Sequence, residues 1–212
     1  KISSDELDLF SIDSRYVEKS ISYNTDKLSA SILNTLISGT IVMYFVFFGG
    51  IDHLSAIIKD ANIFQLNTDL LTIIIFVFTM SLVNMPIDVY KTFYIEEKHG
   101  FNKNTINQYL KDTLISLILT LLIVSLLFSI FHALFQKYPE SWWLYMWIAY
   151  IIFNVFILFA YPTIIAPMFN DFKKLSDKEI INIIKTLSNK TNFNITDVYV
   201  MDGSKRSKHS NA

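Results

Sequence analysis

Four apolar stretches, each about as long as a membrane-crossing helix, recur along this chain of 212 residues. A helix needs about 20 predominantly apolar residues to cross the hydrocarbon core of a bilayer. The stretches are residues 28–48, 70–89, 113–135 and 142–161. Core helices of a soluble protein do not supply four such stretches in so short a chain. The sequence therefore predicts a mainly α, polytopic helical membrane protein whose first partner is the lipid bilayer.

Positive charge alternates between the segments that flank these stretches. From the N-terminus, the successive segments hold four, one, four, one and eight Lys or Arg residues. Cytoplasmic loops of membrane proteins carry the excess of Lys and Arg. We therefore expect both tails and the loop between the second and third spans to be cytoplasmic. The abundance of Ile, Asn and Lys favours a bacterial inner membrane; in a eukaryote the host would be the endoplasmic reticulum membrane.

Composition excludes several classes of function. The formal net charge of −1 provides no overall field for nucleic acid, so no nucleic-acid partner is expected. The chain has no cysteine, and its histidines are His53, His99, His132 and His209. No two of them have the His-Glu-x-x-His spacing that places two zinc ligands on one helical face. The histidine spacing and the lack of cysteine therefore predict no metal site within this chain.

The residues after the fourth span have the pattern of a small α/β unit. Pro162 and Pro167 are expected to end that span. The stretch from Ser176 to Glu179 reads as a capping box, followed by apolar residues at helical spacing. Residues 197–201 are rich in strand formers. A second strand is expected to begin near Ser210.

Polar residues near the spans have both a functional and a structural interpretation. Asn84, Asp88 and Asn154 lie in or at the end of spans, where polar groups are functional candidates. The interpretation we favour for Asp88 is that it lies at the interface beside Lys91 and ends the span. Residues 96–102 read as a solvated turn in which Gly100 stops a helix, and Thr105 begins the next helix.

Two Ser-Lys pairs in the tail have the composition of catalytic dyads. They are Ser204-Lys205 and Ser207-Lys208. Such a dyad needs a buried lysine with a lowered pKa. These lysines lie with Arg206 in a polar turn, so we expect solvated cations and no dyad.

Four motifs resemble those of the type I CAAX prenyl proteases, which are integral-membrane zinc metalloendopeptidases. They are residues 18–27, 90–102, 165–175 and 202–212. The second contains Glu-Glu-Lys-His-Gly-Phe-Asn, and the fourth is Asp-Gly-Ser-Lys-Arg-Ser-Lys-His-Ser-Asn-Ala. They occur in family order over nearly the whole chain.

The resemblance implies seven membrane helices around a chamber, with a zinc-protease domain at one end. A zinc-bound water, activated by the Glu of His-Glu-x-x-His, would attack a peptide carbonyl. Substrates would be proteins with a prenylated C-terminal cysteine that lose their last three residues, or other membrane proteins and peptides in a bacterial member. The zinc ligands are expected downstream of Ala212, so this chain by itself is expected to be inactive.

Within this chain, the resemblance implies substrate-binding residues only at the end of the tail. Ser210, Asn211 and Ala212 match the family strand that lines the substrate cleft. Asn211 is the foremost candidate for contact with the substrate backbone, whereas His209 and Arg206 are weaker candidates.

These inferences divide the chain into three parts. Residues 1–27 would be a cytoplasmic tail, 28–165 the membrane region, and 166–212 the start of a peptidase domain that is truncated before the zinc helix. One alternative is a heat-shock-type quality-control zinc protease, which typically has fewer spans before its catalytic helix. Another is a non-catalytic membrane scaffold or a transporter fragment. A transporter would favour internal repeats and charged residues at mid-span, and the sequence shows neither.

Overall fold

The computed structural model describes residues 14–61 and 67–208 of the chain. Within them, four helical segments of 28 to 33 residues are long and apolar enough to cross a membrane. They are Arg15–Phe47, Thr68–Lys98, Ile106–Lys137 and Trp142–Phe169. Each contains one of the four predicted spans, apart from the last residue of the first one, so the prediction of a mainly α, polytopic membrane protein is confirmed.

The helices extend beyond the predicted spans. They are α2 (Ser14–Phe47), α3 (Gly50–Ala61), α4 (Thr68–Tyr90), α5 (Glu96–Lys98), α6 (Ile106–Lys137), α7 (Trp142–Ala160), α8 (Ala166–Phe169) and α9 (Lys178–Thr191). The first helix begins at Ser14, although we expected a span from residue 28 after a polar tail. The apolar criterion missed this extension because its residues are mostly polar. Within it, Tyr23 is buried and Asp26 contacts His99 after α5.

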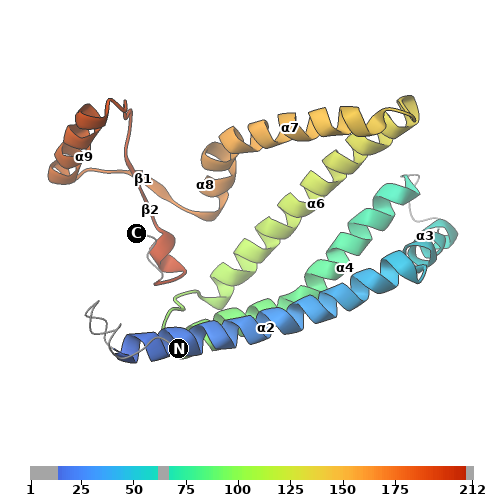
Figure 1. Cartoon of the computed structure of the whole chain (residues 1–212), viewed down its shortest axis with the longest axis horizontal. Helices are drawn as coiled ribbons and strands as arrows, with labels where there is room; N and C mark the ends of the chain where they lie inside the picture. The colour runs from blue at the N-terminus through green and yellow to red at the C-terminus, as the bar shows by residue number, and fades with distance from the viewer. Residues whose placement is uncertain (1–13, 62–66, 209–212) are drawn as a thin grey trace.

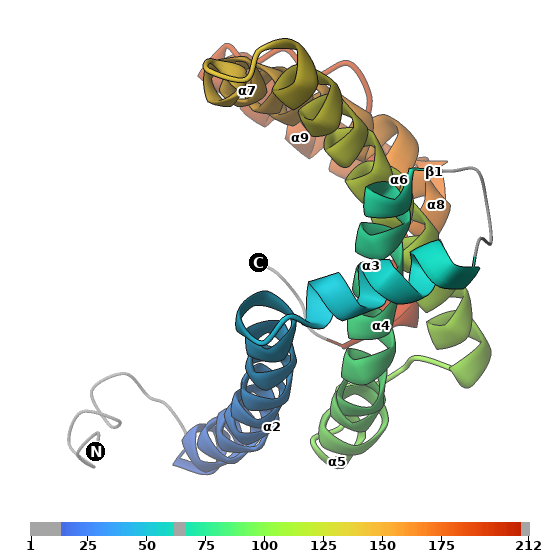
Figure 2. The same ribbon diagram turned by 90° about the vertical axis from the view of Figure 1, so that its right-hand side faces the viewer.

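The helices place the predicted cytoplasmic segments together at one end. Figure 1 shows the start of α2, the end of α4, the start of α6 and the strands toward one end, with α3 and the α6–α7 turn at the other. The view in Figure 2 keeps α3 apart from α5. Helix α4 contacts α2, α3 and α6, and α6 contacts α7 and α8. Segments rich in Lys and Arg therefore share one end.

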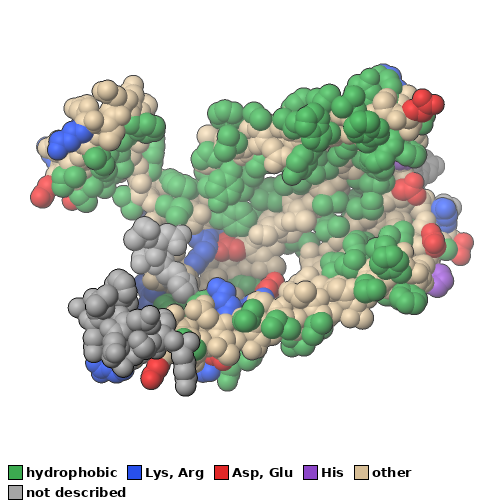
Figure 3. Space-filling view, in the orientation of Figure 1, with side chains coloured by type: hydrophobic (Ala, Val, Ile, Leu, Met, Phe, Trp, Pro, Cys, Tyr) green, Lys and Arg blue, Asp and Glu red, His purple; other side chains and the backbone are tan. Residues whose placement is uncertain are grey.

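The helical surface between the two ends is apolar. Hydrophobic side chains cover most of it, and charged side chains gather toward the ends (Figure 3). Large side chains such as Leu122, Ile152 and Phe159 are exposed within the spans. Such a surface suits lipid or further membrane helices and not water.

Polar side chains at the expected kinds of position begin three helices. The side chain of Asn67 accepts from the backbone N–H groups of α4, and Thr105 Oγ1 accepts from Gln108 N at 3.2 Å, as predicted for α6. For α9, the capping residue is Asp177 and not Ser176, because Asp177 Oδ1 accepts from Glu179 N at 2.9 Å. The helix was predicted correctly, but its N-cap is one residue later than predicted, and Ile180 at the third helical position cannot complete a capping box.

The prediction that Pro162 and Pro167 end the fourth span is only half right. Regular α-helix stops at Ala160, but a π-helical turn, Tyr161–Ile165, leads directly into α8. Pro162 lies in this π-helical turn and Pro167 at the start of α8, and the backbone stays helical at Ala160, Tyr161, Ile165 and Ala166 on either side of the two junctions. The helical path therefore continues to Phe169. A second π-helical turn, Lys91–Ile95, similarly joins α4 to α5.

The tail forms a two-stranded antiparallel sheet, and α9 lies between its two strands in the sequence. Strand β2 (Tyr199–Met201) lies within the predicted strand at residues 197–201. Its partner β1 (Phe172–Lys174) pairs Phe172 with Met201. We did not predict β1, because Phe-Lys-Lys has no strand pattern. The strand expected from Ser210 lies outside the described residues.

Candidate substrate-binding region

The predicted substrate-binding residues lie just after the last described position. His209, Ser210, Asn211 and Ala212 are outside the described residues. The structure does describe the chain up to Lys208. It therefore shows what holds the segment that leads into them.

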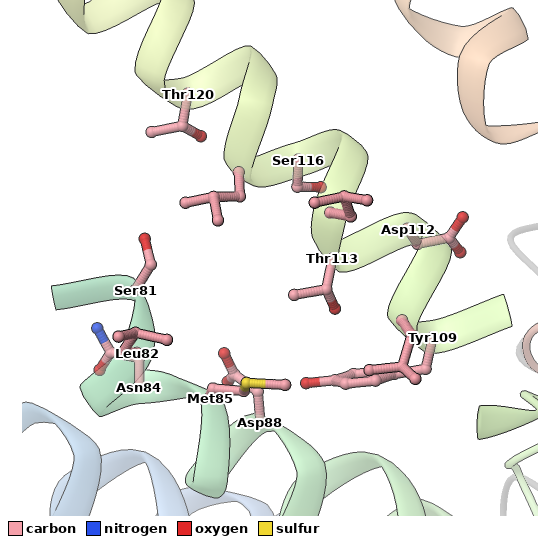
Figure 4. A pocket seen from close by; sticks show the side chains of 13 residues that line it. Ser81, Leu82, Asn84, Met85, Asp88, Tyr109, Asp112, Thr113, Ser116 and Thr120 are labelled. Carbon is pink, nitrogen blue, oxygen red and sulfur yellow. The ribbon is translucent and has the colours of Figure 1, made fainter. Parts of the chain in front are cut away.

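A cavity of about 630 Å³ lies between α4 and α6. Figure 4 shows Thr113, Ser116 and Thr120 along α6, facing Ser81 and Asp88 of α4. Its full lining is Ser81, Leu82, Asn84, Met85, Asp88, Tyr109, Leu110, Asp112, Thr113, Leu114, Ser116, Leu117 and Thr120. Polar side chains at membrane depth face a bundle interior or a water-filled space. The same wall also carries apolar side chains, among them Leu82, Leu114 and Leu117, so it presents both kinds of surface to the cavity.

The polar span residues have different environments. Asn84 Oδ1 accepts a hydrogen bond from Ser38 Oγ at 2.7 Å, so this amide joins α4 to α2. Asp88 is exposed and lines the cavity, and α4 continues past it to Tyr90. The interpretation that Asp88 lies at the membrane interface stays a prediction, and the structure adds that Asp88 lines the cavity. Asn154 donates to the carbonyl of Tyr150 in its own helix.

Arg206 joins the tail to two membrane helices. Its Nε lies 2.6 Å from Asp112 Oδ2, and its Nη2 lies 3.1 Å from Asp112 Oδ1. The same guanidinium donates to Asn170 Oδ1 at 2.7 Å and to the Phe169 carbonyl. The Asp112 carboxylate holds the pKa of Arg206 above its usual value. The structure thus places Arg206 in an internal contact.

Lys205 has the opposite of the environment a dyad requires. Its Nζ lies 2.6 Å from Asp202 Oδ2 and 3.4 Å from Asp171 Oδ2. The hydrogen bond with Asp202 raises the pKa of Lys205, and the hydrogen bond with Lys205 lowers the pKa of Asp202. A lysine with a raised pKa stays protonated and cannot act as a base. The expectation that Ser204-Lys205 is not a dyad agrees with this geometry.

The turn after α5 is partly buried, although we expected a solvated turn. His99 is only 7% exposed, and its Nε2 lies 2.8 Å from Asp26 Oδ2 of α2. Beside it, Tyr23 OH donates to Glu96 Oε1 at 2.6 Å. As predicted, Gly100 stops the helix, with a φ of 76°. The motif therefore docks the end of α4 onto α2.

No zinc site is formed by the described part of the chain. Among those residues, no group of three or more His, Asp or Glu side chains could hold a metal ion. His53, His99 and His132 lie on α3, after α5 and on α6. The donor set therefore does not fit zinc, and we derive no chemical step from a metal here.

Comparison with known proteins identifies the family. The family model described as "CAAX prenyl protease N-terminal, five membrane helices" matches residues 8–171. The chain belongs to the CAAX prenyl protease family. It is accordingly an integral, multi-pass membrane protein, in agreement with its four candidate spans.

Relatives and a solved structure extend this likeness. The chain is 30% identical over 214 residues to the probable CAAX prenyl protease 1 of Schizosaccharomyces pombe, with 95% of this chain and 45% of the relative covered. It is 29% identical to the human CAAX prenyl protease 1 homolog, covering 95% and 44%. The crystal structure of S. mikatae Ste24p matches with a TM-score of 0.83 and 29% identity, over 95% of this chain and 48% of that one. The chain thus spans less than half the length of these relatives.

Sequence reasoning missed the contacts of two carboxylates, Asp112 with Arg206 of the tail and Asp26 with His99 after α5. Asp112 precedes the uncharged third span, and its position as an acid at a span boundary was the available signal. Asp26, which contacts His99, lies in a part of α2 that we read as a tail. Its partner lies 73 positions away. No local pattern could have paired them.

Proposed function

We propose that this chain is the N-terminal, membrane-embedded part of a zinc-dependent endopeptidase of the CAAX prenyl protease type. Its substrates would be prenylated proteins cleaved near the C-terminus, or membrane peptides. The observation that carries the proposal is the family match over residues 8–171. The zinc ligands and catalytic residues would follow Ala212.

In this proposal the described residues form part of the substrate's surroundings. The polar wall between α4 and α6 would line one side of the chamber that receives the substrate. Ser210, Asn211 and Ala212 would offer an extended edge, with unpaired N–H and C=O groups that can pair with a peptide backbone. Asn211 would hydrogen bond to that backbone, and His209 would flank it.

The direct test is hydrolysis by the full-length protein in liposomes. The substrate is a farnesylated peptide that ends in the modified cysteine and three further residues, and mass spectrometry detects the products. We expect release of the last three residues, loss of this activity with 1,10-phenanthroline, and its return with Zn²⁺. The same peptide without the farnesyl group is the control. Cleavage of the unmodified peptide at the same rate would show that prenylation is not required, whereas no hydrolysis of either peptide by folded, zinc-loaded protein would contradict the proposal.

The predicted role of Asn211 has its own test. A hydrogen bond is worth about 0.5–1.5 kcal/mol, so Asn211→Ala should lower kcat/KM by roughly two- to tenfold. The exposed Asn194 in the same domain is the matched control, and Asn194→Ala should leave kcat/KM unchanged. Equal effects of the two substitutions on kcat/KM would show that Asn211 makes no specific contact with the substrate.

We also propose that the tail faces the cytoplasm, from a bacterial inner membrane or from the endoplasmic reticulum membrane of a eukaryote. Two observations support this orientation. The Lys and Arg counts alternate between segments, and the segments with high counts lie at one end of the helices.

A further inference from the structure

The tail crosses the end of the membrane helices through backbone pairing as well as through Arg206. Lys103 N donates to Arg206 O at 3.1 Å, and Lys208 N donates to Phe101 O at 2.9 Å. Between them, Asn102 and Ser207 form an antiparallel bridge. Residues 206–208 are thus held on residues 101–103 by a short two-sided ladder.

The turn that receives this ladder is itself fixed. Two backbone hydrogen bonds join the start of this turn to the end of α5. Gly100 N donates to Glu97 O at 2.9 Å, and Phe101 N donates to Glu96 O at 2.8 Å. The ring of Phe101 packs on Tyr23 of α2, with 4.9 Å between centroids. A continuous series of contacts therefore runs from α2 through this turn to the tail.

The guanidinium of Arg206 also fixes the orientation of the tail relative to α6, which the backbone pairing with residues 101–103 does not do. Asp112 and Arg206 are both mostly buried, with side chains 18% and 22% exposed, and they meet in two parallel hydrogen bonds. Gln108 Nε2 holds the same carboxylate at 2.8 Å. A planar fork of this kind fixes direction as well as distance, which a lysine cannot do.

We propose that Arg206 is a positioning residue that sets the register in which this protein holds its substrate. With Asp112, which also lines the cavity between α4 and α6, and with the Asn102–Ser207 bridge, it fixes residues 206–208 on residues 101–103. Two residues of extended chain span at most about 7 Å, so the covalent chain limits how far position 210 can lie from Lys208. The inference rests on the proposed function, because it assumes that residues 210–212 contact substrate.

The positioning contact is tested first without any activity measurement. This chain has no cysteine, and any cysteine elsewhere in the full-length protein is first replaced by serine. Paired residues of antiparallel strands have Cα atoms about 4.5–5.5 Å apart, which suits a disulfide. We expect Asn102→Cys with Ser207→Cys to cross-link on mild oxidation. The control pair is Lys103→Cys with Ser207→Cys, whose side chains leave the ladder on opposite faces.

The dependence of this cross-link on Arg206 decides whether the contact positions the chain. Adding Arg206→Lys or Asp112→Asn should slow cross-linking by about tenfold, since each removes the paired hydrogen bonds. Asp112→Glu keeps the carboxylate and should recover part of the rate. Cross-linking that is absent, or equally fast in all variants, would overturn the proposal.

The second readout is the bond that the full-length enzyme cleaves. A shifted register presents a neighbouring peptide bond, so Arg206→Lys and Asp112→Asn should give products displaced by one or two residues. Loss of folded protein would only lower the amount of the usual product. Lys185→Ala, at an exposed lysine on α9, is the control and should give the usual product alone. An unchanged product pattern in both variants would overturn the positioning role, whereas a wild-type enzyme without hydrolysis would instead contradict the proposed function.

Discussion

At the scale of single residues, His99 is a buried polar side chain with a carboxylate partner on another helix. It is 7% exposed, and its Nε2 meets Asp26 Oδ2 at 2.8 Å while its ring packs edge-on against Tyr23. Because a carboxylate only accepts, Nε2 carries the proton. His99→Ala should destabilise the full-length protein by about 1–3 kcal/mol, since packing and a buried hydrogen bond are both lost. Thermal unfolding in detergent measures this.

The exposed His53 of α3 is the control for this substitution. His53→Ala should change stability by no more than about 0.5 kcal/mol, as surface substitutions usually do. His99→Gln retains an N–H donor and should fall between the two. A similar midpoint for the His99→Ala and His53→Ala proteins would show that the contact with Asp26 contributes nothing.

Asp202 gives the tail a pH dependence with a defined sign. The hydrogen bond from Lys205 holds the pKa of Asp202 below its ordinary value of 3.8. Its contribution to the folded tail is therefore fully present above about pH 4 and is lost as the pH falls through the lower, folded-state pKa. A carbon-detected NMR titration should place the Asp202 midpoint below 3.8. Lys205→Ala should raise the titration midpoint of Asp202, and the control Lys185→Ala should not. A midpoint that stays the same in Lys205→Ala would show that Lys205 does not lower the pKa of Asp202.

At the scale of elements, the end of α5 depends on one backbone conformation. Gly100 has a φ of 76°, and an added Cβ would meet nothing within 4 Å. Gly100→Ala should therefore lower the free energy of unfolding by about 1–2 kcal/mol, because alanine is strained in the left-handed backbone conformation. Gly39 lies within α2 and is equally open, but without a positive φ, so Gly39→Ala should stabilise by about 0.5–1 kcal/mol. Opposite shifts in the unfolding midpoint are expected, and shifts of the same sign would contradict this account.

The elements also show what the sequence could and could not predict. The four spans were predictable because membrane helices need long apolar runs, and the start of α6 was predictable because Thr105 caps it locally. Strand β1 was not, because its pairing with β2 is a long-range choice that Phe-Lys-Lys does not encode. The continuation past Pro162 was missed because the π-helical turn accommodates a residue that usually ends a helix.

The candidate site divides in the same way. The motif at residues 202–212 indicated where substrate-binding residues would lie, through the family resemblance. What anchors that motif could not be read from it, because Arg206 finds Asp112 at a distance of 94 positions along the chain. The burial of His99 likewise arises from α2, in a region that looked like a polar tail. Composition identifies such residues as polar, and only the fold supplies their partners.

At the scale of the whole molecule, orientation in the membrane can be tested at both ends of the helices. Ser176 lies in the tail and Glu140 in the turn between α6 and α7, and both are exposed. Because this chain has no cysteine, Ser176→Cys and Glu140→Cys each provide a single labelling site in a background cleared of other cysteines. In intact cells or sealed vesicles, a membrane-impermeant maleimide should label position 140 and not 176 from the non-cytoplasmic face. Permeabilisation should expose both.

The structure makes this pair of sites decisive, because the two positions belong to opposite ends of the same helices. An odd number of spans separates them, since residue 140 precedes α7 and residue 176 follows it. Reversed labelling would therefore overturn the orientation while leaving the fold intact. Labelling of both sites from one face would instead contradict the crossing of α7 itself. In that case the apolar surface of α7, with Trp147, Ile152 and Phe159 exposed, would have to be covered by protein.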